Sequence, residues 1–200
     1  KIKITKCKKN EKGTEIIFTP DESIFETTQF SPRKLYDFIK MKAVLVSRTI
    51  IDFKIDKELI SDNTPNYEKF HFKNGIADFL DKKNKNTAKL FDKQFSIIKN
   101  INDNEKCEIF ISFNQNEKSS LISFCNTIET PDGGSHENGF KNGVLKALKL
   151  YGQKNQVSKI SNININDLTD YTDIIISIFI NEPSFEGQTK KRIIMPKLQK

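Results

Sequence analysis

The chain contains few of the residues that build small reactive sites. Among its 200 residues are three cysteines, two histidines and no tryptophan. The cysteines are widely spaced and form no C-x-x-C pair, which argues against a disulfide framework and favours a reducing compartment. No Cys/His cluster has zinc spacing, so a structural zinc site is not expected.

Long apolar runs are also lacking. None approaches the ~20 residues that a membrane helix needs, and the N-terminal stretch KIKITKCKKNEKG has no apolar region of a secretory signal. The chain is nevertheless 36% apolar with 16 phenylalanines, enough to bury the core of one large domain. We therefore expect a globular, cytoplasmic protein with no membrane partner.

Arginine is scarce although the chain is basic. The net charge is +7 from 33 basic and 26 acidic residues, yet the arginines are only Arg33, Arg48 and Arg192. A bias toward Lys, Ile and Asn is typical of an A+T-rich genome, so composition alone could account for the charge. A basic surface facing DNA is the alternative, although dedicated nucleic-acid sites usually favour Arg.

Hydrophobic periodicity predicts an α+β fold, a sheet with helices mainly on one face. Strands are expected at 1–19 (a hairpin), 48–56, 68–75, 94–103, 105–114, 119–130 and 173–180. Helices are expected at 31–47, 75–86, 136–155 and, as a short element, within 162–172. The run DIIISIFI at 173–180 is apolar on both faces, which predicts an interior strand.

Local signals predict where several elements begin, end and connect. Ser31 and Ser135 are candidate N-caps, and Gly152 is the expected stop of the long helix. The polar stretches NDNEK (102–106) and NQNEK (114–118) are expected to close hairpins.

Two polar stretches are candidates for binding chemistry. The first, TPDGGSHENG (130–139), places two glycines before a helix and could cradle a phosphate. It lacks both the G-K-[ST] and the dinucleotide glycine patterns, so a tight turn is favoured. His136 has no nucleophile pattern beside it and is interpreted as structural.

The second candidate is GQTKKR (187–192), which follows the apolar strand. If a helix began near Thr189, its dipole would disfavour each cation by roughly 0.3–1 kcal/mol. A bound anion such as a phosphate would offset that cost, and lysine suits it as a compact charge. Pro196 follows soon after, which argues against a continuous helix from Thr189.

Three stretches together resemble the B subunits of bacterial type IIA DNA topoisomerases, a family that contains those of gyrase and of topoisomerase IV. They are GTEIIFTPDESIF (13–25), NTIETPDGGSHENGF (126–140) and ISIFINEPSFEGQTKKR (176–192), in the order and spacing of that family. The stretch 33–56 resembles the topoisomerase IV branch more than the gyrase branch.

The resemblance implies a transducer fold like the second domain of ribosomal protein S5. That fold is a mixed sheet with a left-handed β-α-β crossover, an exception to the usual right-handed rule. Residues 1–20 would be the last hairpin of an ATPase domain, and residues 21–195 the transducer domain. Residues 196–200 would begin the connector to a metal-binding domain.

The resemblance also implies roles for individual residues. Gln188, Thr189 and Lys190 would contact the γ-phosphate of an ATP held by the ATPase domain. Lys190 would neutralise charge in the transition state, and Gln188 would bind the phosphate or order the attacking water. Lys141 lies where the family often has an arginine facing DNA. Lysine keeps the positive charge but lacks the planar guanidinium that donates two parallel hydrogen bonds. No metal ligand is implied.

ATP and Mg²⁺ are the cofactors implied for the intact subunit, with none held by this chain alone. The implied partners are DNA, the ATPase domain of the same subunit, a second copy of the subunit and a DNA-cleaving A-type subunit. The implied location is the bacterial cytoplasm at the nucleoid. The chain lacks the catalytic Glu-Asn helix, the DxGxG loop and the glycine-rich lid, so this part of an ATP-hydrolysing isomerase is expected to be inactive alone.

Two rival classes remain. A stand-alone basic module of S5-like fold would bind nucleic acid without any link to ATP, and tight, salt-dependent DNA binding by the chain alone would favour it. A small-molecule enzyme is disfavoured because no nucleophile, metal or dinucleotide pattern is present.

Overall fold

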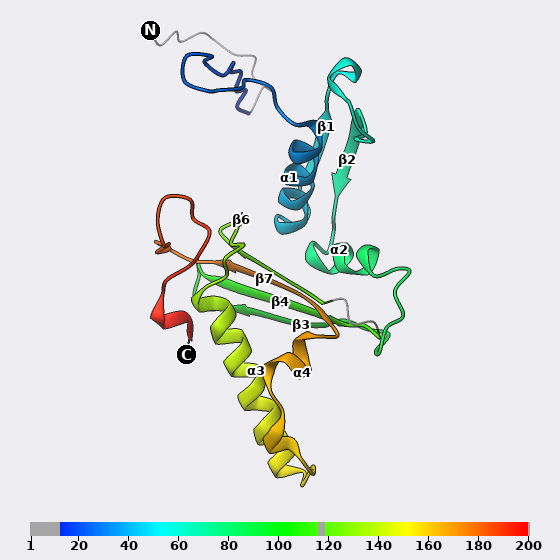
Figure 1. The fold of residues 1–200 in the computed structure, drawn as a ribbon, viewed down its shortest axis with the longest axis vertical. Helices are drawn as coiled ribbons and strands as arrows, with labels where there is room; N and C mark the ends of the chain where they lie inside the picture. The colour runs from blue at the N-terminus through cyan, green and yellow to red at the C-terminus, as the bar shows by residue number, and fades with distance from the viewer. Residues whose placement is uncertain (1–12, 116–118, 200) are drawn as a thin grey trace.

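The computed structural model describes residues 13–115 and 119–199, which form two separate sheets and the helices around them (Figure 1). The α-helices are α1 (Pro32–Leu45), α2 (Ile76–Lys83), α3 (Ser135–Lys154) and α4 (Ile165–Thr169). The strands are β1 (Ile50–Lys54), β2 (Tyr67–His71), β3 (Phe95–Asn100), β4 (Lys106–Phe113), β5 (Ser120–Cys125), β6 (Ile128–Glu129) and β7 (Thr172–Phe179). Short 3₁₀ segments are η1 (Lys57–Leu59), η2 (Ile160–Asn162) and η3 (Pro196–Gln199). Within the described ranges, no helix is long and apolar enough to cross a membrane.

The first unit packs α1 against an antiparallel pair, β1 and β2. The Ser31 hydroxyl accepts a hydrogen bond from the Lys34 amide, so the predicted N-cap is confirmed, with proline at the first helical position. The Tyr36 ring lies edge-on to Phe53 and Phe70 at 5.5 and 5.3 Å between centroids. These three aromatic side chains are buried and hold the helix on the strands.

The second unit is a five-stranded mixed sheet in the order β3-β4-β7-β5-β6. Strand β7 lies between β4, which is antiparallel to it, and β5, which is parallel. The expected interior strand is therefore confirmed, as is the α+β class with a mixed sheet. Helix α3 lies in the connection between the parallel strands β5 and β7, so a β-α-β crossover is present; its left-handed sense stays a prediction.

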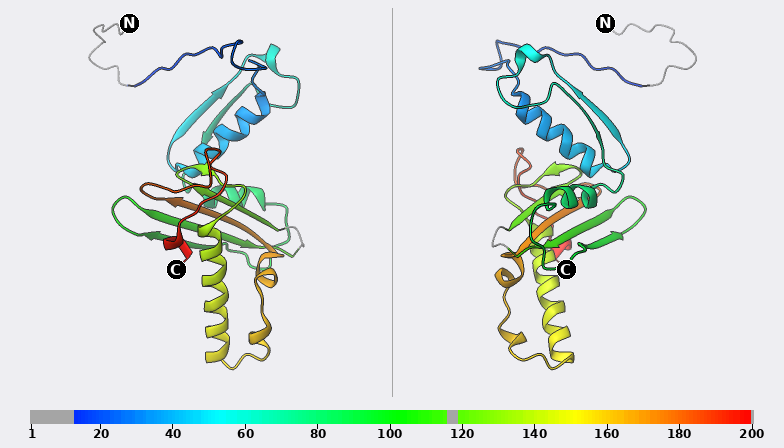
Figure 2. Two further views of the ribbon diagram at one scale, coloured as in Figure 1. Left: turned by 60° about the vertical axis from the view of Figure 1, so that its left-hand side comes forward. Right: turned by 90° about the vertical axis from the view of Figure 1, so that its right-hand side faces the viewer.

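Helices cover both faces of this sheet rather than mainly one, and the strands alternate accordingly. Ile175 of β7 packs with Phe110 and Phe124 in the cluster that includes α1 and α2. Ile174 and Ile176 point to the opposite face, in the cluster that includes α3. Figure 2 shows α3 projecting from one side of the sheet while α1, β1 and β2 lie on the other.

Two predicted connections differ in the structure. Residues 13–20 form no strand, and the remainder of the expected hairpin, residues 1–12, lies outside the described residues. The stretch after β4 closes no hairpin, because β7 is inserted between β4 and β5. By contrast, β3 and β4 are paired neighbours across the first predicted hairpin loop.

Two predicted helix ends also differ, and in both cases a distant segment is the reason. The N-cap of α3 is Gly134, with Ser135 already helical and making no capping bond to the helix. Gly152 does not end α3, which continues to Lys154. A β-carbon at Gly152 would lie 2.1 Å from the Ile160 side chain, so this glycine lets the returning chain pack against the helix.

Candidate functional site

The Gln188–Lys190 loop is the tip of a short hairpin that follows β7. The Glu186 amide donates to the Arg192 carbonyl at 2.9 Å, and the Ile194 amide donates to the Ser184 carbonyl at 2.9 Å. These two bonds close the base of the hairpin and leave the tip without a strand partner. The segment thus projects as a defined loop rather than as a continuation of β7.

Backbone geometry at the tip keeps all three predicted side chains exposed. Gly187 turns the chain with φ of 81°, and Lys190 adopts φ of 56°, a conformation that lysine rarely takes. Gln188, Thr189 and Lys190 are each exposed to solvent. The Lys190 ammonium lies 6.0 Å from the centroid of the Phe185 ring, at the outer limit of a cation–π contact.

The helix considered at Thr189 does not form; the chain stays irregular until η3 begins at Pro196. The helix-dipole argument for a bound phosphate is therefore wrong, although the doubt raised by the proline is confirmed. The three cations of the loop differ in their surroundings. Arg192 lies 3.5 Å from Glu186 in an exposed ion pair, whereas Lys190 and Lys191 have no acidic partner among the described residues. Two unpaired positive charges are thus presented at or next to the tip.

The glycine pair before α3 is filled by the protein's own chain and does not form a phosphate cradle. Gly134 has φ of 134°, and a β-carbon there would lie 2.3 Å from the Ile193 carbonyl oxygen. The Ile193 amide donates to the Gly133 carbonyl at 3.1 Å, and its own carbonyl accepts from the Ser135 amide at 3.0 Å. The Met195 amide donates to the Ser135 hydroxyl at 2.9 Å. The segment that follows the Gln188–Lys190 loop, residues 193–195, therefore lies against the start of α3.

His136 is buried within a hydrogen-bonded polar group. Its Nε2 lies 3.2 Å from the Thr130 hydroxyl, which lies 2.6 Å from the Ser123 hydroxyl, and Ser123 donates to the Glu137 carboxylate at 2.7 Å. Burial lowers the pKa of His136, and the Glu137 carboxylate opposes that shift only in part. Only 5% of His136 is exposed and its Nε2 lies against Thr130, which favours the structural interpretation.

Lys141 lies on α3, one turn after Glu137. Its ammonium is 3.5 Å from the Glu137 carboxylate, and 35% of its side chain is exposed. Within the described part of the chain, no hydrogen bond or ion pair joins Lys141 to the Gln188–Lys190 loop. The predicted site residues thus fall in two separate places.

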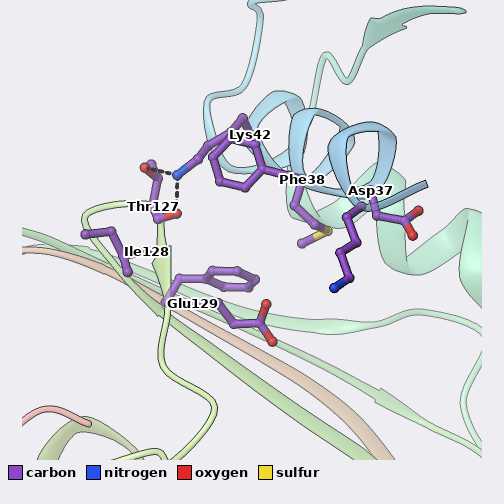
Figure 3. Close-up of a pocket in the computed structure, with 9 residues that line it drawn as sticks. Asp37, Phe38, Lys42, Thr127, Ile128 and Glu129 are labelled. Carbon is purple, nitrogen blue, oxygen red and sulfur yellow. Dashed lines mark hydrogen bonds between the residues drawn. The ribbon is translucent and has the colours of Figure 1, made fainter. Parts of the chain in front are cut away.

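A cavity of about 490 Å³ lies between α1 and the β5–β6 turn (Figure 3). The Lys42 ammonium reaches across it and donates to the Thr127 carbonyl at 2.6 Å and to the Thr127 hydroxyl at 2.9 Å. Burial lowers the pKa of Lys42. No sequence pattern indicated this contact, because its partners are 85 positions apart.

Asp173, at the start of β7, is a second polar centre that sequence patterns did not indicate. The Lys83 ammonium donates to its carboxylate at 2.7 Å, Asn114 donates at 2.9 Å, and Ser120 donates a third hydrogen bond. Burial opposes ionisation of the carboxyl group, but these donors together lower its pKa. The cluster ties α2 to the sheet. No group of three or more His, Cys, Asp and Glu residues in the described ranges could hold a metal ion.

Comparison with known proteins gives one family. A family profile described as DNA gyrase B matches residues 75–200. The B subunit of DNA topoisomerase 4 from Rickettsia felis is 38% identical over 189 residues, which are 93% of this chain and 28% of that protein. The chain therefore spans less than a third of the length of this relative.

Solved structures give the same result for the fold. The topoisomerase IV ATP-binding domain of Francisella tularensis superposes with a TM-score of 0.70 at 26% identity, over 90% of this chain and 47% of that one. The B-subunit of the DNA gyrase from Myxococcus xanthus superposes with a TM-score of 0.74 at 19% identity, over 91% of this chain and 56% of that one. Because the profile match spans more than half of the chain, we conclude that this chain belongs to the DNA gyrase B family.

Proposed function

We propose that this chain couples ATP turnover to movement of a DNA clamp in the ATPase subunit of a type IIA topoisomerase. The Gln188–Lys190 loop would reach the γ-phosphate of an ATP bound, with Mg²⁺, to the ATPase domain of the same subunit. The observation behind this proposal is an exposed tip with unpaired cations on a hydrogen-bonded base. Apart from the 6.0 Å contact of Lys190 with the Phe185 ring, the described residues offer the side chains of the tip no polar partner, so the tip can bind an anion on another domain.

The chemistry of the tip suits a transferring phosphoryl group. Lys190 would neutralise the charge that develops on the phosphate oxygens, and Gln188 offers an amide that can bind the phosphate or orient the attacking water. Thr189 would add its backbone and hydroxyl donors. Release of the phosphate would free the loop and let the two domains move apart.

We propose a later start for the transducer than residue 21, the boundary that the resemblance implies. The family profile begins at residue 75, and the five-stranded sheet with α3 follows α2. This supports a transducer from about α2 onward, followed at residues 196–200 by a connector to a further domain. The unit of α1, β1 and β2 would then belong with the ATPase domain. Residues 16–25 expose Ile16, Ile17, Phe18 and Ile24, as expected of a surface that packs on another domain.

The proposed partners follow from the same role. They are DNA, a second copy of the ATPase subunit and an A-type subunit that cleaves DNA. Lys141 would face the DNA, but its ion pair with Glu137 and its single charge predict a weak, salt-dependent contribution.

The decisive experiment is Lys190→Ala in the complete subunit. We expect kcat for ATP hydrolysis to fall about 10²–10³-fold, the range for loss of one donor to a developing charge. Lys191→Ala is the matched control, since it removes a neighbouring exposed cation and should change kcat less than about threefold. Normal turnover in Lys190→Ala would refute the role of the loop. Nanomolar DNA binding by this chain alone at physiological salt would instead favour a stand-alone nucleic-acid-binding module.

A further inference from the structure

The outgoing end of the Gln188–Lys190 loop is held by a side chain from another strand pair. Asn126, in the turn between β5 and β6, donates through Nδ2 to the Ile180 carbonyl at 2.9 Å and accepts from the Ile180 amide at 2.9 Å. Its own amide donates to the Ile178 carbonyl at 2.8 Å. The Asn126 amide group thus extends the sheet by one position beyond β7.

One position further, the chain meets a buried carboxylate. The Asn181 amide donates to Oε1 of Glu105 at 3.2 Å, and Glu105 lies at the end of the β3–β4 turn. The other oxygen, Oε2, accepts from Asn102 at 2.7 Å. Only 8% of Glu105 is exposed, so the carboxylate depends on these protein donors rather than on water.

The returning end of the loop reaches the same carboxylate oxygen. The Lys197 ammonium, in η3, lies 3.2 Å from Oε1 of Glu105. Oε1 of Glu105 therefore contacts both Asn181, which precedes the loop, and Lys197, which follows it. The hydrogen bond from Lys197 is the largest of the effects that lower the pKa of Glu105.

We propose that Glu105 is a positioning residue, which sets the reach of the Gln188–Lys190 loop by holding both of its ends. The inference rests on the proposed function of that loop. Between Asn181 and Lys197 the chain forms the short hairpin closed by the Glu186–Arg192 and Ile194–Ser184 hydrogen bonds, and this hairpin as a whole gains freedom when either end is released. With both ends held, the tip has a limited set of positions from which Lys190 can meet a phosphate. Glu105 does not touch the phosphate in this scheme and acts only through the loop.

The first test uses this chain and hydrogen exchange. Glu105→Ala should speed amide exchange in residues 181–195 about tenfold, because local opening becomes easier there, and leave α1 unchanged. Glu108→Ala is the matched control. Glu108 lies on the same hairpin and is ion-paired with Lys106, and its contacts do not include the described residues 180–197. Should Glu105→Ala unfold the chain, Lys197→Met makes the same test, since it removes the ion pair and leaves Glu105 in place.

The second test uses ATP hydrolysis by the complete subunit. Glu105→Ala should lower kcat about tenfold while KM for ATP changes less than about twofold, and Glu105→Gln should recover most of kcat because its Oε1 still accepts from Asn181. In a Lys190→Ala background, Glu105→Ala should cause no further loss, since both act through one group. A purely structural effect would instead be additive.

The outcomes separate the two proposals. Faster exchange in residues 181–195 with a kcat loss that vanishes in the Lys190→Ala background supports the role of Glu105. Unchanged exchange, or an additive kcat loss, overturns it. If Lys190→Ala alone leaves turnover normal, the function of the loop fails first, and the exchange result still shows whether Glu105 holds the loop.

Discussion

The glycine pair before α3 offers a sharp test of how the loop is attached to the rest of the molecule. Gly134 adopts φ of 134° and ψ of −155°, a region that is essentially reserved for glycine. A β-carbon there would lie 2.3 Å from the Ile193 oxygen and 2.6 Å from the Ile193 nitrogen. Both neighbours are backbone atoms, so no side chain can move aside to make room. Gly134→Ala should therefore displace the segment around Ile193, which follows the Gln188–Lys190 loop.

The expected magnitude follows from two contributions. Forcing a residue with a β-carbon into this backbone conformation costs about 1–3 kcal/mol. Displacing Ile193 weakens its hydrogen bonds with Gly133 and Ser135, each contributing about 0.5–1.5 kcal/mol. Together these predict a loss of about 2–6 kcal/mol in the free energy of unfolding.

Urea unfolding followed by circular dichroism measures this change. Gly143→Ala is the control, because Gly143 lies in the same helix with nothing within 4 Å of the added carbon. Alanine there should stabilise the protein by about 0.5–1 kcal/mol. Opposite signs for the two substitutions are required. If both substitutions change the free energy of unfolding in the same direction and by the same amount, the close approach of Ile193 does not demand glycine.

Two further predictions concern pH. The pKa of Asp173 is lowered in the folded state, so its stabilising effect is present above the unfolded value of about 3.9 and is lost as pH falls through the folded pKa. Asp173→Asn should remove this acid sensitivity and cost about 1.5–3 kcal/mol at pH 7, measured by urea unfolding; equal acid sensitivity in both proteins would contradict it. His136 also has a lowered pKa, so stability should be full above about pH 6.5 and decline as pH falls toward the folded pKa. His136→Gln should flatten that decline between about pH 7.5 and 5.5, and an undiminished slope would show that other groups cause it.

Much of the secondary structure could be predicted because the signals are local. The alternation in 48–56 and 68–75 gave β1 and β2, and the run 173–180, apolar on both faces, gave the interior strand β7. Pairing was less predictable, since a polar loop after β4 looks the same whether or not its strands are neighbours. The alternating stretch at 13–19 shows the converse: without a partner among the described residues, its pattern makes no strand.

The candidate site was predictable in type but not in shape. Charge and glycine identified the GQTKKR segment, but the helix considered there does not form, and an exposed hairpin tip takes its place. The sequence predicts an N-cap at Ser135, because serine before a helix usually is one. In the structure its hydroxyl accepts from Met195, a residue 60 positions away that no local rule can place beside it.

The sequence by itself determined the family, the α+β class and the segment that bears the exposed lysines, because each depends on composition, periodicity or a short motif. The tertiary structure alone decided that Gly134 accommodates Ile193 and that Asn126 and Glu105 hold the two ends of the loop. It also decided that Lys42 meets Thr127. These contacts join residues far apart in the chain. Those of Asn126 and Glu105 exist because β7 pairs between β4 and β5, which brings the turns of both neighbours to the base of one loop.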